Sequence, residues 1–449
     1  MRRLPLCLLA PLALAAAACE PDAVPVPFRP PPESPREAYM HALEDAGLAG
    51  TALGADWAAA GRAALAAPVT VELPYREARY LAPDEPGALA YRFPVRRGQR
   101  LEVSVDARSS GPHRIFMELY RAPEGDEPAA LVAAAEEGAS LLERPIRLSR
   151  DYIVRVQPEL LRGGRYTVTL RLGPSLSFPV DGRGEDAIQS RFGAPRDGGN
   201  RDHHGVDIFA PRGTPALAAA AATVSRVDTT ARGGRVVWLR DSEFGQSLYY
   251  AHLDRPLVRA GQRVAPGDTV GLIGNTGNAR TTPPHLHFGI YSRGPQDPWP
   301  YLYRPPGALP AVPDELPALG DWARVEGEGV ALRAAPSSEA AATPLPTGAA
   351  VRLTGASGSW LAVRTPDGRS GYVARARITQ EARPLLSHRL AARAPLLAYP
   401  AAAAPVMDSL PAGQELAVLG RHAGFLLVRS GGRDGWLGEA EVALGAAQR

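Results

Sequence analysis

The sequence predicts a mainly β protein with several domains. Short runs that alternate apolar and polar residues recur along most of the chain, and Gly, Pro and Asp separate them, which is typical of antiparallel strands. The length of 449 residues exceeds what one hydrophobic core usually organises. The tail contains a duplication, because the motif at 345–348 returns at 410–413. We therefore expect an N-terminal β-sandwich, a central antiparallel-β domain and two small C-terminal β-barrels.

The first residues have the pattern of an export signal. Residues 1–18 begin with two arginines and continue as an apolar run that is too short for a transmembrane helix. Cys19 follows three alanines, and this arrangement resembles the lipobox of bacterial lipoproteins, in which that cysteine becomes the lipidated first residue. Glu20 in the next position implies outer-membrane sorting. We expect an exported, membrane-anchored lipoprotein that faces the periplasm; the alternative is ordinary signal cleavage that leaves Cys19 free.

Three segments lead from this signal to the centre of the chain. Residues 20–37 are rich in proline and predict an extended tether. Residues 38–68 have helical composition and spacing, interrupted by glycines such as Gly54. Residues 69–175 contain several alternating runs and predict the β-sandwich, which either spaces its neighbours or binds a ligand.

The stretch 284–290 carries the clearest functional pattern. On a strand, the two-residue period places His285 and His287 on one face, and Leu286, Phe288 and Ile290 on the other. Two imidazoles would then point into a cleft. Such a pair is a common metal-ligand arrangement, but it needs further ligands.

The further ligands lie upstream. If residues 203–207 form a strand, His203 and Asp207 share a face and could converge on one ion, while His204 points away. Imidazole and carboxylate groups suit zinc, and three protein ligands with one open position are typical of a catalytic zinc site. The spacing leaves open which histidine of the pair at 285 and 287 is the third ligand. His252, on another apolar run, is a further candidate.

Together, the segments 203–207, 250–253 and 284–288 resemble the lysostaphin/LytM-type zinc metallopeptidases in order and approximate spacing. The resemblance implies a LytM-type zinc metallopeptidase domain over residues 176–303. It implies that His203, Asp207 and His287 bind Zn²⁺ and that His252 and His285 assist catalysis. One of these two histidines would act as the base and the other would contact the oxyanion, and either order is compatible with the motifs.

The chain beyond this domain predicts binding modules. Residues 304–321 are proline-rich and are expected to form a linker. The duplicated segments 322–380 and 381–445 resemble bacterial Src-homology-3-like domains, which implies binding of peptide or glycan. Three aromatic residues could line a groove or fill the small cores: Trp360, Tyr372 and Trp436.

These features favour one function and leave two alternatives. The resemblance implies a zinc-dependent endopeptidase, and export, anchoring and the C-terminal modules suggest a substrate that cannot diffuse, peptidoglycan. We therefore expect hydrolysis of the peptide cross-links of peptidoglycan. A catalytically silent regulator that activates other cell-wall hydrolases is the alternative, and residues 69–175 or the loop 281–284 could cover the groove. A cupin-like metal enzyme would need a Glu shortly after the histidine pair, and the chain lacks one. No nucleic-acid partner is expected, because the net charge of +3 is small and the arginines are scattered among Asp and Glu.

Overall fold

The computed structural model describes residues 30–109, 114–312, 319–379 and 384–443. The expected signal peptide, Cys19 and residues 20–29 of the expected tether lie outside the described residues. The predicted mainly β fold class is confirmed, since strands dominate and gather into several antiparallel sheets. Among the described residues, no helix combines the length and apolar character needed to cross a bilayer.

Two helices precede the first sheets. In α1 (Pro35–Asp45), the side chain of Ser34 caps the N-terminus by accepting a hydrogen bond from the amide of Glu37. In α2 (Ala52–Ala66), Thr51 caps in the same way, so Gly54 lies in the first turn of the helix and does not end it, contrary to the sequence-based expectation. Trp57 of α2 is buried and donates to the carbonyl of Pro158, which fixes the helix against the sheet behind it.

The strands between 69 and 174 form two packed layers. One layer has the order β1-β3-β8-β5-β6 and the other contains β2-β9-β4-β7. Apolar side chains of both layers form one buried core. Their bounds are β1 (Val69–Thr70), β2 (Tyr75–Leu81), β3 (Leu89–Val95), β4 (Gln99–Ser109), β5 (Ile115–Arg121), β6 (Ala130–Ala134), β7 (Leu141–Pro145), β8 (Arg150–Pro158) and β9 (Gly164–Pro174).

The central sheet has the strand order β10-β13-β20-β17-β16-β15-β18. Its bounds are β10 (Ile188–Ser190), β13 (Val206–Phe209), β14 (Pro215–Leu217), β15 (Ala222–Thr230), β16 (Gly234–Asp241), β17 (Ser247–Pro256), β18 (Arg263–Val264), β19 (Thr269–Ile273), β20 (His285–Tyr291) and β21 (Pro295–Gln296). A small hairpin, β11 (Pro195–Arg196) with β12 (Arg201–Asp202), precedes β13, and a short helix, α3 (Trp299–Leu302), follows β21.

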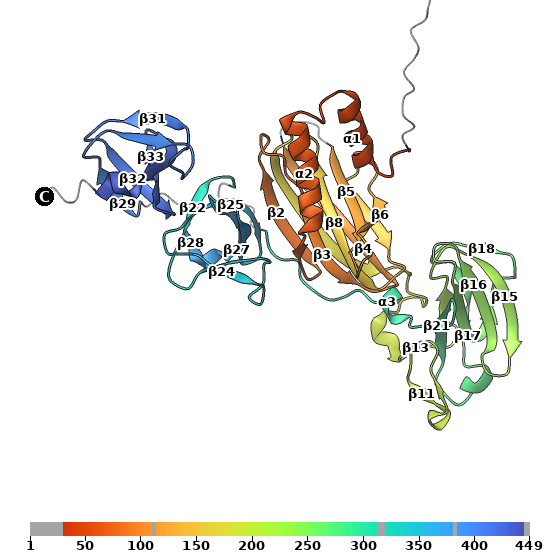
Figure 1. Cartoon of the computed structure of the whole chain (residues 1–449). Helices are drawn as coiled ribbons and strands as arrows, with labels where there is room; N and C mark the ends of the chain where they lie inside the picture. The colour runs from red at the N-terminus through yellow and green to blue at the C-terminus, as the bar shows by residue number, and fades with distance from the viewer. Residues whose placement is uncertain (1–29, 110–113, 313–318, 380–383, 444–449) are drawn as a thin grey trace, which may run out of the picture.

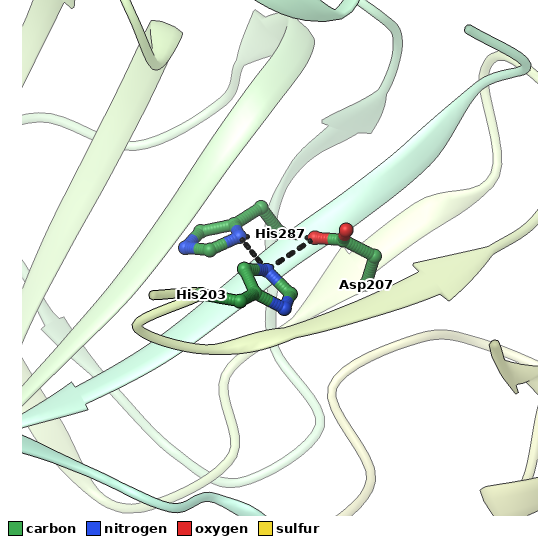
Figure 2. Close-up of side chains that lie close together, drawn as sticks. All are labelled: His203, Asp207 and His287. Carbon is green, nitrogen blue, oxygen red and sulfur yellow. Dashed lines mark hydrogen bonds and ion pairs between the residues drawn. The ribbon is translucent and has the colours of Figure 1, made fainter. Parts of the chain in front are cut away.

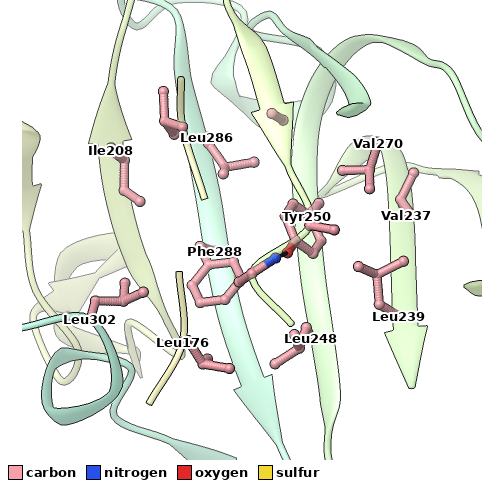
Figure 3. Close-up of a cluster of buried hydrophobic side chains, with 14 of the residues drawn as sticks. Leu176, Ile208, Val237, Leu239, Leu248, Tyr250, Val270, Leu286, Phe288 and Leu302 are labelled. Atoms are coloured by element: carbon pink, nitrogen blue, oxygen red, sulfur yellow. Dashed lines mark hydrogen bonds between the residues drawn. The ribbon is translucent and has the colours of Figure 1, made fainter. Parts of the chain in front are cut away.

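One face of this sheet covers the core of the central domain (Figure 3). Leu286, Phe288 and Ile290 of β20 are fully buried there, as the alternation of this stretch predicts. Tyr250 of β17 packs edge-on against Phe288, and its hydroxyl accepts a hydrogen bond from the amide of Ala219. The residues between these core positions therefore face the opposite side of the sheet.

Two smaller units follow. The first contains β22 (Trp322–Val325), β23 (Ala331–Arg333), β24 (Ala342–Pro344), β25 (Ala350–Ser357), β26 (Trp360–Arg364), β27 (Ser370–Ala374) and β28 (Ile378–Thr379). The second contains β29 (Leu386–Arg389), β30 (Ala394–Leu397), β31 (Val406–Leu410), β32 (Glu415–His422), β33 (Phe425–Ser430), β34 (Arg433–Gly438) and α4 (Glu439–Ala443). Each unit has a separate cluster of buried apolar residues.

The first of these units shares a sheet with the sandwich. Strand β25 pairs with β2, with Ala78 opposite Ala356. In Figure 1 the central domain and the two C-terminal units lie on opposite sides of the sandwich, although they are neighbours in sequence. The segment 304–312 runs between them along the sandwich, where Gly307 approaches the ring of Pro74 and the amide of Gly358 donates to the carbonyl of Ala311. The segment expected as a linker therefore packs against its neighbours.

The aromatic residues of these units fill the contacts between units. Tyr372 is buried, and Arg79 of the sandwich donates to its hydroxyl. Trp436 is buried edge-on against Trp322 of the preceding unit. Trp360 is half-buried. Tyr372 therefore fills a contact between units, whereas Trp436, although buried, also lies at the wall of a surface pocket with Trp322 and Tyr399.

Candidate metal centre

Three side chains converge on the face of the central sheet opposite the core. His203 Nε2 lies 2.9 Å from His287 Nδ1 and 3.0 Å from Asp207 Oδ1 (Figure 2). His287 Nδ1 and Asp207 Oδ1 are 3.0 Å apart. The side chain of His203 is 2% exposed, and those of Asp207 and His287 are 12% and 15% exposed, so solvent reaches the cluster on the side of Asp207 and His287.

The register of two strands brings this cluster together. Asp207 on β13 is the direct cross-strand partner of His287 on β20, and such partners have neighbouring side chains. His203 comes from the loop after β12, because β13 begins only at Val206. The strand expected from His203 to Asp207 is therefore wrong at its start. His204 is exposed and stacks with Phe192, away from the cluster, as predicted.

The chemistry of these atoms fits a divalent cation. Two imidazole nitrogens and a carboxylate oxygen, each of which can offer a lone pair, all lie within 4.8 Å of one another. Lone pairs at this separation repel unless a proton or a cation lies between them. Nitrogen and oxygen ligands of this kind suit zinc. His203, Asp207 and His287 could thus hold one metal ion.

Neighbouring groups orient these atoms. The carbonyl of Arg191 lies 2.9 Å from His203 Nδ1, so a proton on Nδ1 can be donated to it and Nε2 keeps its lone pair. Arg196 donates to Asp207 Oδ2 at 2.7 Å, which leaves Oδ1 directed at the imidazoles. Burial raises the pKa of Asp207, but hydrogen bonds and charge interactions with His203 and His287 outweigh it and hold this pKa well below its usual range. Burial lowers the pKa of His287, which favours the neutral ring that a metal ligand needs.

His285 and His252 lie beside the cluster. The His285 ring is on the same face of β20 as His287, and its Nε2 is 4.0 Å from Asp207 Oδ1. The centroid of the His252 ring is 5.0 Å from that of His285 and 5.9 Å from that of His287. In both residues, Nδ1 lies within hydrogen-bond distance of a backbone carbonyl, that of Pro283 for His285 and that of Thr276 for His252. A proton on Nδ1 leaves Nε2 of each ring as an acceptor.

His252 reaches this face through an irregularity in β17. The two-residue period would place it with Leu248 and Tyr250 on the core side. Instead its φ is +62°, and the pairing of β17 with β16 shifts register next to it, as in a β-bulge. Such a conformation is costly for a residue other than glycine and is found preferentially at functional sites. Burial lowers the pKa of His252 to about 4.

All five residues predicted for the site therefore lie close together. Arg196 is an additional residue that the sequence did not single out. An arginine near the first motif gives no signal in a chain in which every one of the 50 basic residues is Arg. The carbonyls of Arg191 and Thr276 also escape prediction, because any residue can supply a backbone carbonyl.

Comparison with known proteins matches this part of the chain to a peptidase family. Residues 201–298 match the model of Peptidase family M23. The chain is 30% identical to the L-Ala–D-Glu endopeptidase of Bacillus subtilis over 185 residues, which are 39% of this chain and 52% of that protein. It is 39% identical over 123 residues to the peptidoglycan DD-endopeptidase ShyC of Vibrio cholerae, or 26% of this chain and 27% of that protein. The chain thus spans about half and about a quarter of these curated relatives.

Among solved structures, the chain is similar to the catalytic domain of the antimicrobial peptidase lysostaphin from Staphylococcus simulans. The sequence identity is 31%, the match covers 25% of this chain and 88% of that domain, and the TM-score is 0.23.

Proposed function

We propose that this chain, which carries a peptidase family M23 domain at residues 201–298, is a zinc-dependent metalloendopeptidase that hydrolyses peptide cross-links of peptidoglycan. The observation that carries the proposal is the convergence of His203, Asp207 and His287, with His252 and His285 beside them. The M23 match and the two endopeptidase relatives support the reaction class and the substrate class.

In this proposal, His203 Nε2, Asp207 Oδ1 and His287 Nδ1 hold the zinc ion. A zinc ion held by three protein ligands supplies Lewis acidity toward a carbonyl oxygen and lowers the pKa of water. Arg196 fixes the rotation of the Asp207 carboxylate, and the Arg191 carbonyl fixes the tautomer of His203. These two hydrogen bonds keep the ligand atoms of Asp207 and His203 oriented before the metal binds.

We assign acceptance of a proton from the attacking water to His252. Its low pKa keeps the ring neutral at pH 7, and the proton on Nδ1 is committed to the Thr276 carbonyl. Nε2 can then accept a proton and later donate it to the leaving amine. Contact with the developing negative charge on the carbonyl oxygen falls to His285. With Nδ1–H donated to the Pro283 carbonyl, Nε2 can donate to this oxygen only in the doubly protonated ring.

The contacts between the sandwich and the central domain lie away from the five site residues. Arg97 of the sandwich donates hydrogen bonds to the hydroxyls of Tyr301 and Ser292 in the central domain. Arg147 of the sandwich contacts the segment 243–244. Within the described parts of the chain, none of these contacts reaches the five site residues. The contacts of the sandwich therefore leave the five site residues uncovered, which favours an active enzyme over a silent regulator whose groove the sandwich covers.

We further propose that the protein is exported and anchored in a membrane through Cys19, facing the periplasm, with the outer membrane as its location. The pattern of residues 1–19 supports this placement. In the same proposal, the units at 322–379 and 384–443 act as Src-homology-3-like modules that bind the cell wall, and other cell-wall hydrolases are partners. An immobile substrate agrees with an enzyme that is tethered and carries binding modules.

The test is muropeptide analysis of isolated sacculi after incubation with the zinc-loaded protein. We expect cross-linked muropeptides to disappear with the wild type and with His41→Ala, a control in α1 outside the site. His203→Ala should lose its zinc and with it the activity, because it removes a proposed ligand. His285→Ala should be slower by at least about 100-fold, as is typical for loss of a group that stabilises the oxyanion. Unchanged cross-links in the presence of a zinc-loaded wild type would refute the proposed activity.

A further inference from the structure

A row of aromatic side chains continues the site face away from the metal cluster. Tyr249 lies 5.8 Å from the His287 ring, and Trp238 lies 4.3 Å from Tyr249, measured between ring centroids. The ring of Tyr291 lies 5.3 Å from that of Trp238. We call Tyr249, Trp238 and Tyr291 the aromatic row. All three side chains are half-buried, so each keeps part of its surface available to a ligand.

The sheet register shows that this row and the metal cluster share one face. Trp238 on β16 pairs with Tyr249 on β17, and Tyr249 pairs with Gly289 on β20, two residues from His287. Gly289 is needed in this arrangement, because a Cβ atom there would lie 2.9 Å from the ring of Tyr291. The absence of a side chain at Gly289 therefore leaves room for the ring of Tyr291 beside it.

Arg226 ends the row. It is the cross-strand partner of Trp238 on β15, and its guanidinium lies 5.4 Å from the centre of the Trp238 ring. Arg226 is exposed and forms no ion pair with any carboxylate in the described parts of the chain, Asp228 on the same strand included. Burial raises the pKa of the Tyr249 hydroxyl, while its hydrogen bond with Thr230 and, to a smaller extent, the charges of Arg226 and Arg232 act in the opposite direction. The far end of the row is therefore positively charged.

From this geometry we infer a specificity subsite for a peptide that carries a free carboxylate about three residues from the bond to be cleaved; the inference rests on the proposed peptidase function. Arg226 binds the carboxylate, and the aromatic row supports the intervening residues. The guanidinium of Arg226 lies over the ring of Trp238, and Trp238 is two strands from β20, which is about 10 Å at the usual spacing of strands. An extended peptide covers about 3.4 Å per residue, so about three residues span this distance.

The subsite distinguishes between two kinds of cross-link. An acidic stem peptide would place a carboxylate over Arg226, where the adjacent aromatic surface excludes part of the water that screens the charge. A bridge of glycines has no carboxylate and little side-chain surface for the aromatic row. We therefore assign acidic stem peptides, and not oligoglycine bridges, as the substrate class.

The test measures binding separately from cleavage. Two synthetic peptides of one stem-like sequence are used, one with a free side-chain carboxylate and one with this group converted to a primary amide. Calorimetry on the chelator-treated full chain gives the affinity for each, in the wild type and in Arg226→Gln. The control is Arg259→Gln, which removes an exposed arginine of the same domain from the turn before β18.

The wild type and Arg259→Gln should bind the acidic peptide about fivefold more tightly than the amide, as expected for an exposed guanidinium–carboxylate pair. Arg226→Gln should bind both peptides equally. Equal binding of both peptides by the wild type, or a preference that persists in Arg226→Gln, would overturn the subsite. If the zinc-loaded wild type does not cleave sacculi, the proposed peptidase is refuted. That result leaves the subsite test intact, because the peptide affinities are measured without metal.

Discussion

Arg196 holds the Asp207 carboxylate from the side opposite the two imidazoles. Its guanidinium donates to Oδ2 at 2.7 Å, while Oδ1 faces His203 and His287. We expect Arg196→Gln to weaken zinc binding by about 10-fold to 100-fold, the usual range for loss of a group that orients a metal ligand. Competition with a chelator of known affinity gives this value.

Arg201→Gln is the matched control for this prediction. Arg201 lies on the same β11–β12 hairpin but pairs with Asp197, away from the cluster. Its replacement should leave the zinc affinity unchanged. An Arg196→Gln variant that binds zinc as tightly as Arg201→Gln would show that Asp207 needs no second partner.

The buried His252 predicts a pH dependence of stability. Its pKa in the folded chain is about 4, below the ordinary value of 6.5, so between these values the unfolded chain binds a proton that the folded chain excludes. The contribution of His252 is complete above pH 6.5 and is lost as the pH falls toward 4. Between pH 7 and pH 5 the loss is about 2 kcal/mol.

Urea unfolding of the metal-free protein at pH 7 and pH 5 tests this prediction. In His252→Gln, the decrease in the free energy of unfolding between these two pH values should be smaller by about 2 kcal/mol than in the wild type. An equal decrease in both proteins would mean that His252 titrates normally in the folded chain.

At the level of single residues, the sequence predicts which side chains meet but not how each is held. The resemblance of three motifs identified His203, Asp207, His252, His285 and His287, and the structure brings all five together. The alternation of β17 predicts that His252 faces the core. Its positive φ instead turns the side chain toward the site. A backbone conformation of this kind leaves no signature in the types of the surrounding residues.

Among the elements, the loop before β13 packs closely against the strand that carries His287. A Cβ atom on Gly205 would lie 2.5 Å from the carbonyl oxygen of Phe288 and 2.9 Å from His287 Nε2. We expect Gly205→Ala to displace His287 and to lower the free energy of unfolding by about 1–3 kcal/mol, as is usual for overpacking. The variant should also bind zinc more weakly, which metal analysis after dialysis measures.

Gly294→Ala provides the comparison for this loop. Gly294 lies between β20 and β21, where an added Cβ meets no atom within 4 Å. Both stability and zinc content should stay close to those of the wild type. If Gly205→Ala behaved like Gly294→Ala, the loop would be free to move and would not define the position of His287.

The strands were predictable where one face is buried. In β20 the alternation of 284–290 assigns each side chain to its correct face, because Leu286, Phe288 and Ile290 fill the core. Residues 203–205 read equally well as a strand, but they form a loop. No core contact distinguishes the two readings in such a short segment, so its conformation depends on the hairpin and on β20.

For the whole molecule, a buried charge joins the sandwich to the first C-terminal unit. Glu77 is fully buried, accepts a hydrogen bond from the Tyr91 hydroxyl at 2.7 Å and pairs with Arg79 at 3.4 Å. Arg79 in turn donates to Tyr372 of the C-terminal unit. Glu77→Ala would leave Arg79 without its counter-charge, and we expect a loss of about 3 kcal/mol in the free energy of unfolding.

Calorimetry of the full chain should show this loss in one transition that the sandwich and the unit at 322–379 share. Glu72→Ala, which removes an exposed carboxylate next to β2, should change stability by no more than about 0.5 kcal/mol. Separate transitions for the two units in the wild type would contradict the joined sheet.

This junction could not be predicted from the sequence. The pairing of β2 with β25 joins residues that are far apart in the chain, and the alternation of each strand is satisfied with or without that partner. The proline-rich composition of 304–321 indicated only an extended segment. Its course along the sandwich depends on local packing, such as the close approach of the Gly307 backbone to the ring of Pro74.

The central claim is that one zinc ion, held by His203, Asp207 and His287, is required to cleave peptide cross-links. The most direct measurement is a zinc titration of the metal-free protein in which bound zinc and the rate of cross-link loss from sacculi are determined on the same samples. We predict that the rate rises in proportion to bound zinc and reaches its plateau at one ion per chain. A full rate without zinc, or a site filled with zinc that leaves every cross-link intact, would contradict the claim.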